Sequence, residues 1–302
     1  MHTPRIFNNQ KYLLFFINFI RSYINTATLN LLTSSILVSI SGAFRVYIAS
    51  LLLGTHVTPL VCIAGGLVIY SVYTLDRALD SKEDLINHPE LDDSCRELGI
   101  VLSILSLICG GWVFLLNGLL IFTFVPFVIG FLYSKGLKIG SSVLKLKGSL
   151  GGKNLVVGCI WGVSVVGVAG ATCQNIPLLI LVFTYFVIKL FVNSTIYDFR
   201  DIPGDFKAGI KTLPVYLGEQ KTRNFLLGLH LVSHLLLSIG MINGVVAFEP
   251  VIVVYSFVCG LGCIRRYTKI GAETESMKLQ RTAFIDGESV FITLIRASLS
   301  IV

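Results

Sequence analysis

Charged residues are scarce in this chain. Only 14% of its 302 residues are Asp, Glu, Lys or Arg, whereas 54% are hydrophobic. A water-soluble domain typically carries about 25% charged residues, so this chain lacks the polar surface to face water on all sides. The mean hydropathy of +0.80 agrees with this conclusion. The scarcity of charge excludes an ordinary soluble protein and indicates an integral membrane protein.

Two familiar sequence signals are also missing. The first ten residues are polar and include Arg5, Asn8 and Asn9, with no short apolar run that leads to a small-residue cleavage site. A cleavable signal peptide is therefore not expected. None of the seven Cys shows paired CxxC spacing, so neither a zinc site nor a disulfide framework is supported. Most of the cysteines lie in apolar segments and are expected to pack as small apolar residues.

Long apolar runs recur along the whole chain. A helix needs about 20 apolar residues to cross the hydrocarbon core of a bilayer. The runs predict an all-α, multi-pass membrane bundle of about nine helices, in a single domain that covers residues 1–302. The predicted spans are 26–46, 52–75, 98–115, 117–134, 152–171, 176–199, 222–246, 249–265 and 282–301.

Basic residues are almost absent from one side of this predicted bundle. If successive spans alternate in direction, nearly all of the 24 Lys and Arg residues fall in the N-terminal segment and the even-numbered connections. Arg45 alone lies on the opposite side, while Lys189 and Arg296 fall within spans. Positive charge marks the cytoplasmic side, so the sequence predicts a cell-membrane protein with a cytoplasmic N-terminus. The net charge of +7 follows from this topology and gives no reason to expect a nucleic-acid partner.

Acidic residues cluster at the predicted cytoplasmic end of the second span. Asp76, Asp80, Glu83 and Asp84 are spaced i, i+4, i+7 and i+8, which places four carboxylates on one face if the helix continues. Like charges so close to a bilayer repel one another and are poorly solvated. A helix tolerates such a cluster when a cation neutralises it, and Mg²⁺ prefers carboxylate oxygens and usually bridges to phosphate.

A second cluster stands at the equivalent end of the sixth span. Asp198, Asp201 and Asp205 are spaced i, i+3 and i+7, although Pro203 and Gly204 argue that the helix bends or ends there. Two carboxylate sets are thus expected to face each other across the bundle and hold metal ions. Nearby basic residues suited to a diphosphate are Arg77, Lys135, Lys138, Arg200 and Lys207. Glu90, Asp92, Asp93 and Glu97 have no matching cluster and are interpreted as solvated loop residues.

These motifs resemble those of the UbiA superfamily of intramembrane prenyltransferases, over nearly the whole chain. The stretch from Asp198 to Gly218, DFRDIPGDFKAGIKTLPVYLG, is similar to the second aspartate-rich motif and the loop after it. The segment Tyr133-Ser-Lys135-Gly-Leu-Lys138 is similar to the family's Tyr/Lys segment, and Lys153-Asn154 to the start of its fifth helix. The first motif departs from the pattern, because Val72 stands where members usually carry Asn.

The resemblance implies nine helices around a cavity that opens to the lipid, and Mg²⁺-dependent transfer of a prenyl group from a prenyl diphosphate to a lipophilic acceptor. It implies Asp76, Asp80, Asp201 and Asp205 as catalytic metal ligands, with Asp198 as a further ligand. The expected partners are a prenyl diphosphate, a lipophilic acceptor and membrane lipid. The substrate-binding residues it implies are Arg77, Tyr133, Lys135, Lys138, Arg200 and Lys207. Tyr73, Tyr133 and Tyr197 flank the clusters, and an ordinary interfacial role is favoured for each.

Other interpretations stay open. Acidic residues in membrane helices also mark cation routes, so a transporter is an alternative, as is an inactive relative in view of Val72. His230 and His234 have metal-binding spacing but no third ligand, and packing is favoured. Lys189 is expected to face a polar partner or to snorkel. Asp286 and Glu288 are expected either to face the cavity or to serve a helix N-terminus.

Overall fold

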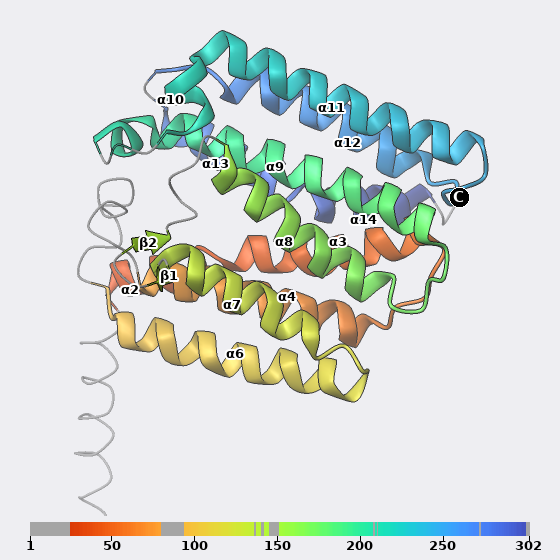
Figure 1. Ribbon diagram of the computed structural model, residues 1–302, viewed down its shortest axis with the longest axis horizontal. Coiled ribbons are helices and arrows are strands. Elements are labelled where there is room, and N and C mark those ends of the chain that lie inside the picture. Colours follow the sequence, from red (N-terminus) through yellow and green to blue (C-terminus); the bar gives the residue numbers. More distant parts are fainter. Residues whose placement is uncertain are drawn as a thin grey trace, which may run out of the picture.

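The computed structural model describes residues 25–79, 94–135, 137–139, 142–144, 151–207, 209, 211–271 and 273–299. Long helices run roughly side by side along the bundle, with α6 at one edge and α11 and α12 at the other (Figure 1). In chain order the helices are α2 (Thr26–Thr33), α3 (Ile36–Leu53), α4 (Pro59–Ala78), α6 (Arg96–Leu116), α7 (Ile121–Lys135), α8 (Gly152–Ala169), α9 (Ile176–Lys207), α10 (Leu213–Leu217), α11 (Glu219–Ile242), α12 (Pro250–Tyr267), α13 (Glu275–Arg281) and α14 (Glu288–Leu299).

Seven helical segments of the described chain are long and apolar enough to cross a membrane, the first being α2 and α3 together, Thr26–Leu53. The other six are α4, α6, α8, α9, α11 and α12. The fourth and ninth predicted spans also coincide with helices, but α7 has 15 residues and α14 has 12. The multi-pass helical membrane bundle is therefore confirmed, while the number of nine crossings stays a prediction.

The boundary between the first two predicted spans was wrong. The first helical segment continues to Leu53 and ends at Gly54, whose φ of 63° only glycine adopts freely. The next helix begins after Thr58, which accepts a hydrogen bond from the backbone of Val61, with Pro59 in the first turn. Arg45 consequently lies inside α3 and not at its far end.

Shorter elements connect the helices at one end of the bundle. Strands β1 (Leu137–Ile139) and β2 (Ser142–Leu144) form an antiparallel hairpin in which Lys138 is opposite Val143. A π-helical turn, η3 (Thr282–Asp286), joins α13 to α14. Helix α9 runs unbroken through Pro203 to Lys207, so the possibility that it ends at Pro203 was wrong.

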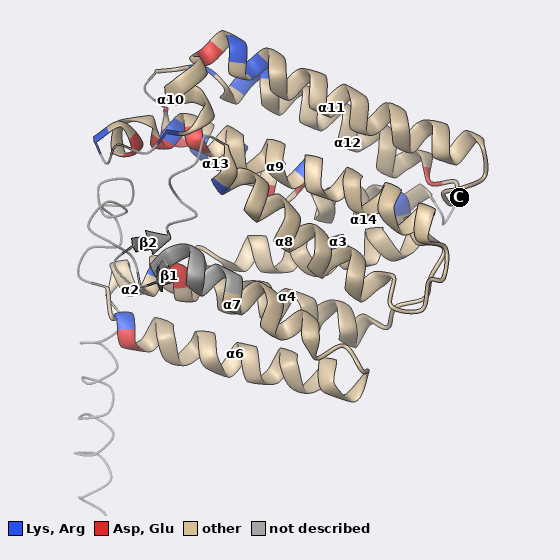
Figure 2. Ribbon diagram, in the orientation of Figure 1, with Lys and Arg blue, Asp and Glu red and all other residues tan. Residues whose placement is uncertain are grey.

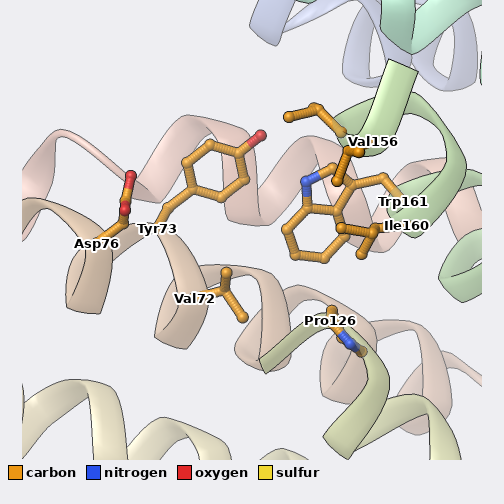
Figure 3. Close-up of a pocket in the computed structure, with 8 residues that line it drawn as sticks. Val72, Tyr73, Asp76, Pro126, Val156, Ile160 and Trp161 are labelled. Carbon is orange, nitrogen blue, oxygen red and sulfur yellow. The ribbon is translucent and has the colours of Figure 1, made fainter. Parts of the chain in front are cut away.

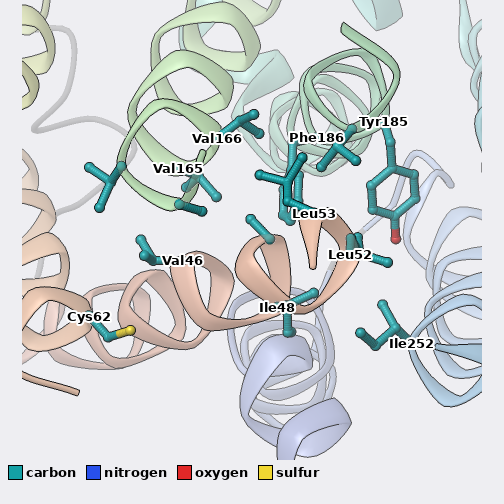
Figure 4. Close-up of a cluster of buried hydrophobic side chains, with 14 of the residues drawn as sticks. Val46, Ile48, Leu52, Leu53, Cys62, Val165, Val166, Tyr185, Phe186 and Ile252 are labelled. Atoms are coloured by element: carbon teal, nitrogen blue, oxygen red, sulfur yellow. The ribbon is translucent and has the colours of Figure 1, made fainter. Parts of the chain in front are cut away.

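The main apolar core lies where α3, α4, α8, α9 and α12 meet (Figure 4). Leu52, Val182 and Ile252 are fully buried there. Helices α8 and α9 approach closely because small residues face the contact: a Cβ at Gly158 would lie 2.7 Å from the carbonyl oxygen of Val187. This close contact fixes α9 beside the start of α8, where both helices carry polar side chains.

Charged side chains gather at the end of the bundle that holds α10, α13 and the start of α6 (Figure 2). The opposite end carries few charged residues. The ion pair between Arg296 and Glu249 (Nη2–Oε1 2.6 Å) lies there among apolar helix ends. The asymmetry expected from the sequence is therefore a feature of the described chain.

Candidate active site

A polar cavity of about 270 Å³ opens at the charged end of the bundle. Helices α3, α4, α8 and α9 and the π-helical turn η3 all contribute to its wall. The lining residues are Val38, Arg45, Tyr73, Asp76, Arg77, Lys153, Val157, Trp161, Leu190, Asn193, Ser194, Tyr197, Asp198, Arg200, Asp201 and Asp286. Residues far apart in sequence thus bring four carboxylates and four basic groups to one small space.

The end of α4 supplies Asp76 and Arg77. Arg77 lies in the last turn of the helix, where a cation also offsets the negative end of the helix dipole. Its Nη1 donates to the hydroxyl of Ser35 (2.9 Å) and to that of Ser34, at the junction of α2 and α3. These bonds hold the guanidinium at the rim, while Asp76, one residue earlier, presents its carboxylate to the cavity.

Asp198 is 1% exposed and already has two partners. Lys153 Nζ lies 3.2 Å from Oδ1, and the amide of Asn154 donates to Oδ2 at 2.5 Å. Asn154 is itself fixed by Ser194, whose hydroxyl donates to its side-chain oxygen at 2.9 Å. A buried carboxylate needs such partners, and this one orients the Lys153 ammonium at the cavity wall.

Asp201 and Asp205 lie one and two turns further along α9. Asp201 accepts two hydrogen bonds from its neighbour Arg200, from Nε at 2.6 Å and from Nη2 at 3.1 Å. Asp205 is 4% exposed and does not line the cavity, and its Oδ2 has no hydrogen-bond partner within the described part of the chain. A buried carboxylate oxygen without a donor is costly unless a ligand completes it.

Tyr197 and Asp286 meet in the wall of the cavity. The Tyr197 hydroxyl donates to Asp286 Oδ2 at 2.5 Å, which joins α9 to η3. The guanidinium of Arg281 lies over the Tyr197 ring, 4.6 Å from its centroid. A π-helical turn is rare and often marks a functional position, and here it carries Asp286 into the cavity.

An apolar branch of about 80 Å³ extends from the polar cavity. The two spaces share Tyr73, Asp76, Val157 and Trp161, and the Tyr73 and Trp161 rings stack with centroids 5.6 Å apart. Figure 3 shows Tyr73 between Asp76 and Trp161. Val72, Pro126, Val156 and Ile160 complete the wall, so the departure from the family motif at Val72 places an apolar side chain in the branch, next to Tyr73.

Some of the predicted site residues lie partly or wholly outside the described residues, and one lies away from the cavity. Asp80 lies outside the described residues. Tyr133 and Lys135 belong to α7 and Lys138 to β1, but their side chains lie outside the described part of the structure. Lys207, the last residue of α9, is exposed and does not line the cavity. Within the described residues, no three His, Cys, Asp or Glu side chains are close enough to form a metal site by themselves.

Other lining residues had not been predicted as part of the site. Arg45 was missed because the first span was ended too early; the apolar run that continues to Leu53 was the signal that places it mid-helix. Asp286 had been considered for the cavity without a decision. Nothing in the sequence marks Trp161 or Asn193 as a site residue, because a lone aromatic or amide side chain in a membrane span is usually a packing residue.

Comparison with known proteins gives the family of this chain. The family model of the UbiA prenyltransferase family matches residues 56–287. No curated protein matches the chain. Fold and cavity define a polytopic helical membrane enzyme. The chain belongs to the UbiA prenyltransferase family and is a prenyltransferase.

Solved structures share the fold at low sequence identity. A UbiA homolog from Archaeoglobus fulgidus bound to DMAPP and Mg²⁺ has a TM-score of 0.59 and 14% identity, covering 92% of this chain and 100% of its own. An apo UbiA homolog from Aeropyrum pernix K1 has a TM-score of 0.57 and 15% identity, covering 85% and 98%. A digeranylgeranylglyceryl phosphate synthase has a TM-score of 0.52 and 19% identity, covering 91% and 95%.

Proposed function

We propose that this enzyme transfers a prenyl group from a prenyl diphosphate to a lipophilic acceptor, in the cavity at the charged end of the bundle. The observation that carries the proposal is the junction of two unlike spaces. A cavity with Arg45, Arg77, Lys153 and Arg200 in its wall opens directly into an apolar branch. A prenyl diphosphate has the same division between a highly charged head and a hydrocarbon tail.

The basic residues are suited to the diphosphate. Guanidinium groups donate to phosphate oxygens in pairs, and the ammonium of Lys153 adds a point charge. They reach the cavity from three helices, α3, α4 and α8, together with Arg200 on α9. Held in this way, the diphosphate lies with its first carbon toward Tyr73, where the apolar branch begins. Lys135, Lys138, Tyr133 and Lys207 remain predicted contributors to the same binding.

The acidic residues offer carboxylate oxygens, the type of ligand atom that Mg²⁺ prefers. Mg²⁺ takes carboxylate and phosphate oxygens and keeps few protein ligands. Asp76 and Asp201 present carboxylates to the cavity, and the unpartnered Oδ2 of Asp205 lies one turn beyond. We propose that these three residues and Asp80 hold the metal. Asp198 is a further candidate ligand if a metal ion replaces Lys153 or Asn154 as its partner. Bound Mg²⁺ neutralises charge that develops on the leaving diphosphate.

The protein then has three tasks in the reaction. Arg45, Arg77, Lys153 and Arg200 stabilise the leaving group as its bond to the first prenyl carbon breaks. Tyr73 and Trp161 line both spaces, beside the proposed position of the reacting carbon, and their π-electrons would attract the positive charge that develops on the prenyl group. The apolar wall excludes water, so that the acceptor and not a water molecule captures the cation.

The proposal is tested by diphosphate release from the purified full chain in detergent, with dimethylallyl, geranyl, farnesyl and geranylgeranyl diphosphates supplied in turn. Release is expected to require Mg²⁺ and to fall about 100-fold or more in Asp76→Ala and in Asp201→Ala, because each removes charge from the reacting centre. Glu275→Ala, on the exposed start of α13, is the matched control and should release diphosphate at the wild-type rate. Unchanged release in both cavity variants would refute the mechanism, and no Mg²⁺-dependent release by the wild type from any of the four diphosphates would count against a prenyl diphosphate as the ligand of this cavity.

A further inference from the structure

A second cavity, separate from the candidate active site, lies between α12 and the segment formed by α13 and η3. Its volume is about 330 Å³. None of its lining residues lines the polar cavity or the apolar branch. Nothing in the proposed reaction uses it.

The second cavity is open to the apolar surface of the bundle. Val258 is 63% exposed and Phe284 is 43% exposed, and both line it. Gly262 leaves the wall between them hollow, because a Cβ there would meet no atom within 4 Å. Helix α12 is long and apolar enough to cross a membrane, so an exposed apolar wall on this helix is suited to contact with a hydrocarbon chain.

One end of the cavity is positively charged. Arg266 lines it in the last turn of α12, and its Nη2 donates to the side-chain oxygen of Gln280 on α13 at 2.8 Å. Arg266 follows Val258 by eight positions, so its Cα lies ~12 Å further along the helix. This end of the cavity lies at the charged end of the bundle, beside α13 (Figure 2).

We propose that this cavity binds an anionic phospholipid, with the headgroup phosphate on Arg266 and an acyl chain against Val258, Gly262 and Phe284. Charge complementarity selects the headgroup, since a basic side chain at a membrane surface attracts an anionic lipid. A water-soluble anion does not suit this cavity, because most of the cavity wall is apolar. Phe284 lies two residues before Asp286, so the lipid and the active-site cavity contact the same π-helical turn.

The binding test uses the purified full chain in mild detergent, mixed with phosphatidylglycerol or phosphatidylcholine, and counts retained lipids by native mass spectrometry. Wild-type protein is expected to retain phosphatidylglycerol in preference to phosphatidylcholine. Gly262→Trp fills the cavity and should lower phosphatidylglycerol binding at least 10-fold. The matched control is Gly228→Trp on α11, where a Cβ also meets open space and which lines none of the cavities described above.

A second pair of variants tests the headgroup contact independently of cavity filling. Arg266→Gln should weaken phosphatidylglycerol binding about 10-fold, the loss expected for one charge-assisted hydrogen bond, and leave phosphatidylcholine binding unchanged. Arg265→Gln removes the neighbouring exposed charge, which does not line the cavity, and should change neither. Equal binding in Arg266→Gln and Arg265→Gln, or displacement of the lipid by one equivalent of geranylgeranyl diphosphate, would overturn the proposal. Retained lipid is measured without turnover, so inactivity of the enzyme does not affect the outcome.

Discussion

At the scale of single residues, the most consequential contact outside the cavity is an ion pair within the bundle. Lys189 Nζ, in the middle of α9, lies 2.7 Å from Glu288 Oε1 at the start of α14. Both residues are buried, at 7% and 5% exposed. Glu288 follows Asp286 by two residues, so the pair ties η3 to α9 and holds Asp286 near Tyr197. Lys189 therefore has a polar partner, and the snorkelling alternative is wrong.

Removal of one partner of this pair is expected to cost much more than removal of both. Glu288→Gln leaves the Lys189 ammonium buried without a counter-charge, which typically lowers the free energy of unfolding by about 3–5 kcal/mol. The double variant Lys189→Met with Glu288→Leu replaces the pair by apolar groups and should recover most of that loss. Thermal unfolding in detergent measures both. A single variant as stable as the wild type would mean that the pair does not hold the helices together.

The same residues show what the sequence alone predicted and what it did not. Asp76, Asp198 and Asp201 were recognisable because acidic spacing repeats at two span ends, and helix geometry does bring them to one cavity. The partner of Lys189 was not recognisable, since 99 residues separate it from Glu288 and only tertiary packing joins them. Arg45 depended on a helix boundary set by Gly54 and Thr58, where local turn chemistry decides and hydropathy does not.

At the scale of whole elements, α9 organises the site, and α8 determines where α9 lies. Asn154 and Lys153 on α8 bind Asp198 on α9, and the small residues further along α8 let the two helices approach. Gly158 and Gly162 are four residues apart, a spacing of small residues that is typical of close helix packing. The polar contacts at one end and the tight contact in the middle thus act on the same pair of helices.

Gly158→Ala should separate α8 from α9. The new Cβ would lie 2.7 Å from the Val187 carbonyl oxygen and 3.4 Å from the Phe191 amide nitrogen, both backbone atoms that cannot rotate away. Such overpacking typically destabilises by about 1–3 kcal/mol. Gly228→Ala, where the Cβ meets no atom within 4 Å, is the control and should be neutral or slightly stabilising. Equal melting temperatures for the two variants in detergent would contradict the importance of this contact.

At the scale of the whole molecule, the separation of charge between the two ends predicts orientation. Arg45, Lys189 and Arg296 all lie in helices, so within the described chain the end opposite the cavity carries no basic loop residue. The positive-inside rule predicts that the cavity opens on the cytoplasmic side, where soluble metabolism would supply a diphosphate. The second cavity, at the same end, would face the anionic cytoplasmic leaflet.

Cysteine accessibility in intact cells tests this orientation. In a variant that lacks the seven native cysteines, Asn117→Cys, in the turn between α6 and α7, should react with a membrane-impermeant maleimide added outside. Glu275→Cys, at the start of α13 on the charged end, should react only after the membrane is permeabilised. Both positions are exposed, so a difference in labelling reports the side of the membrane and not burial. The reverse pattern would place the cavity outside, and a diphosphate made in the cytoplasm would then have no direct path to Arg77 and Arg200.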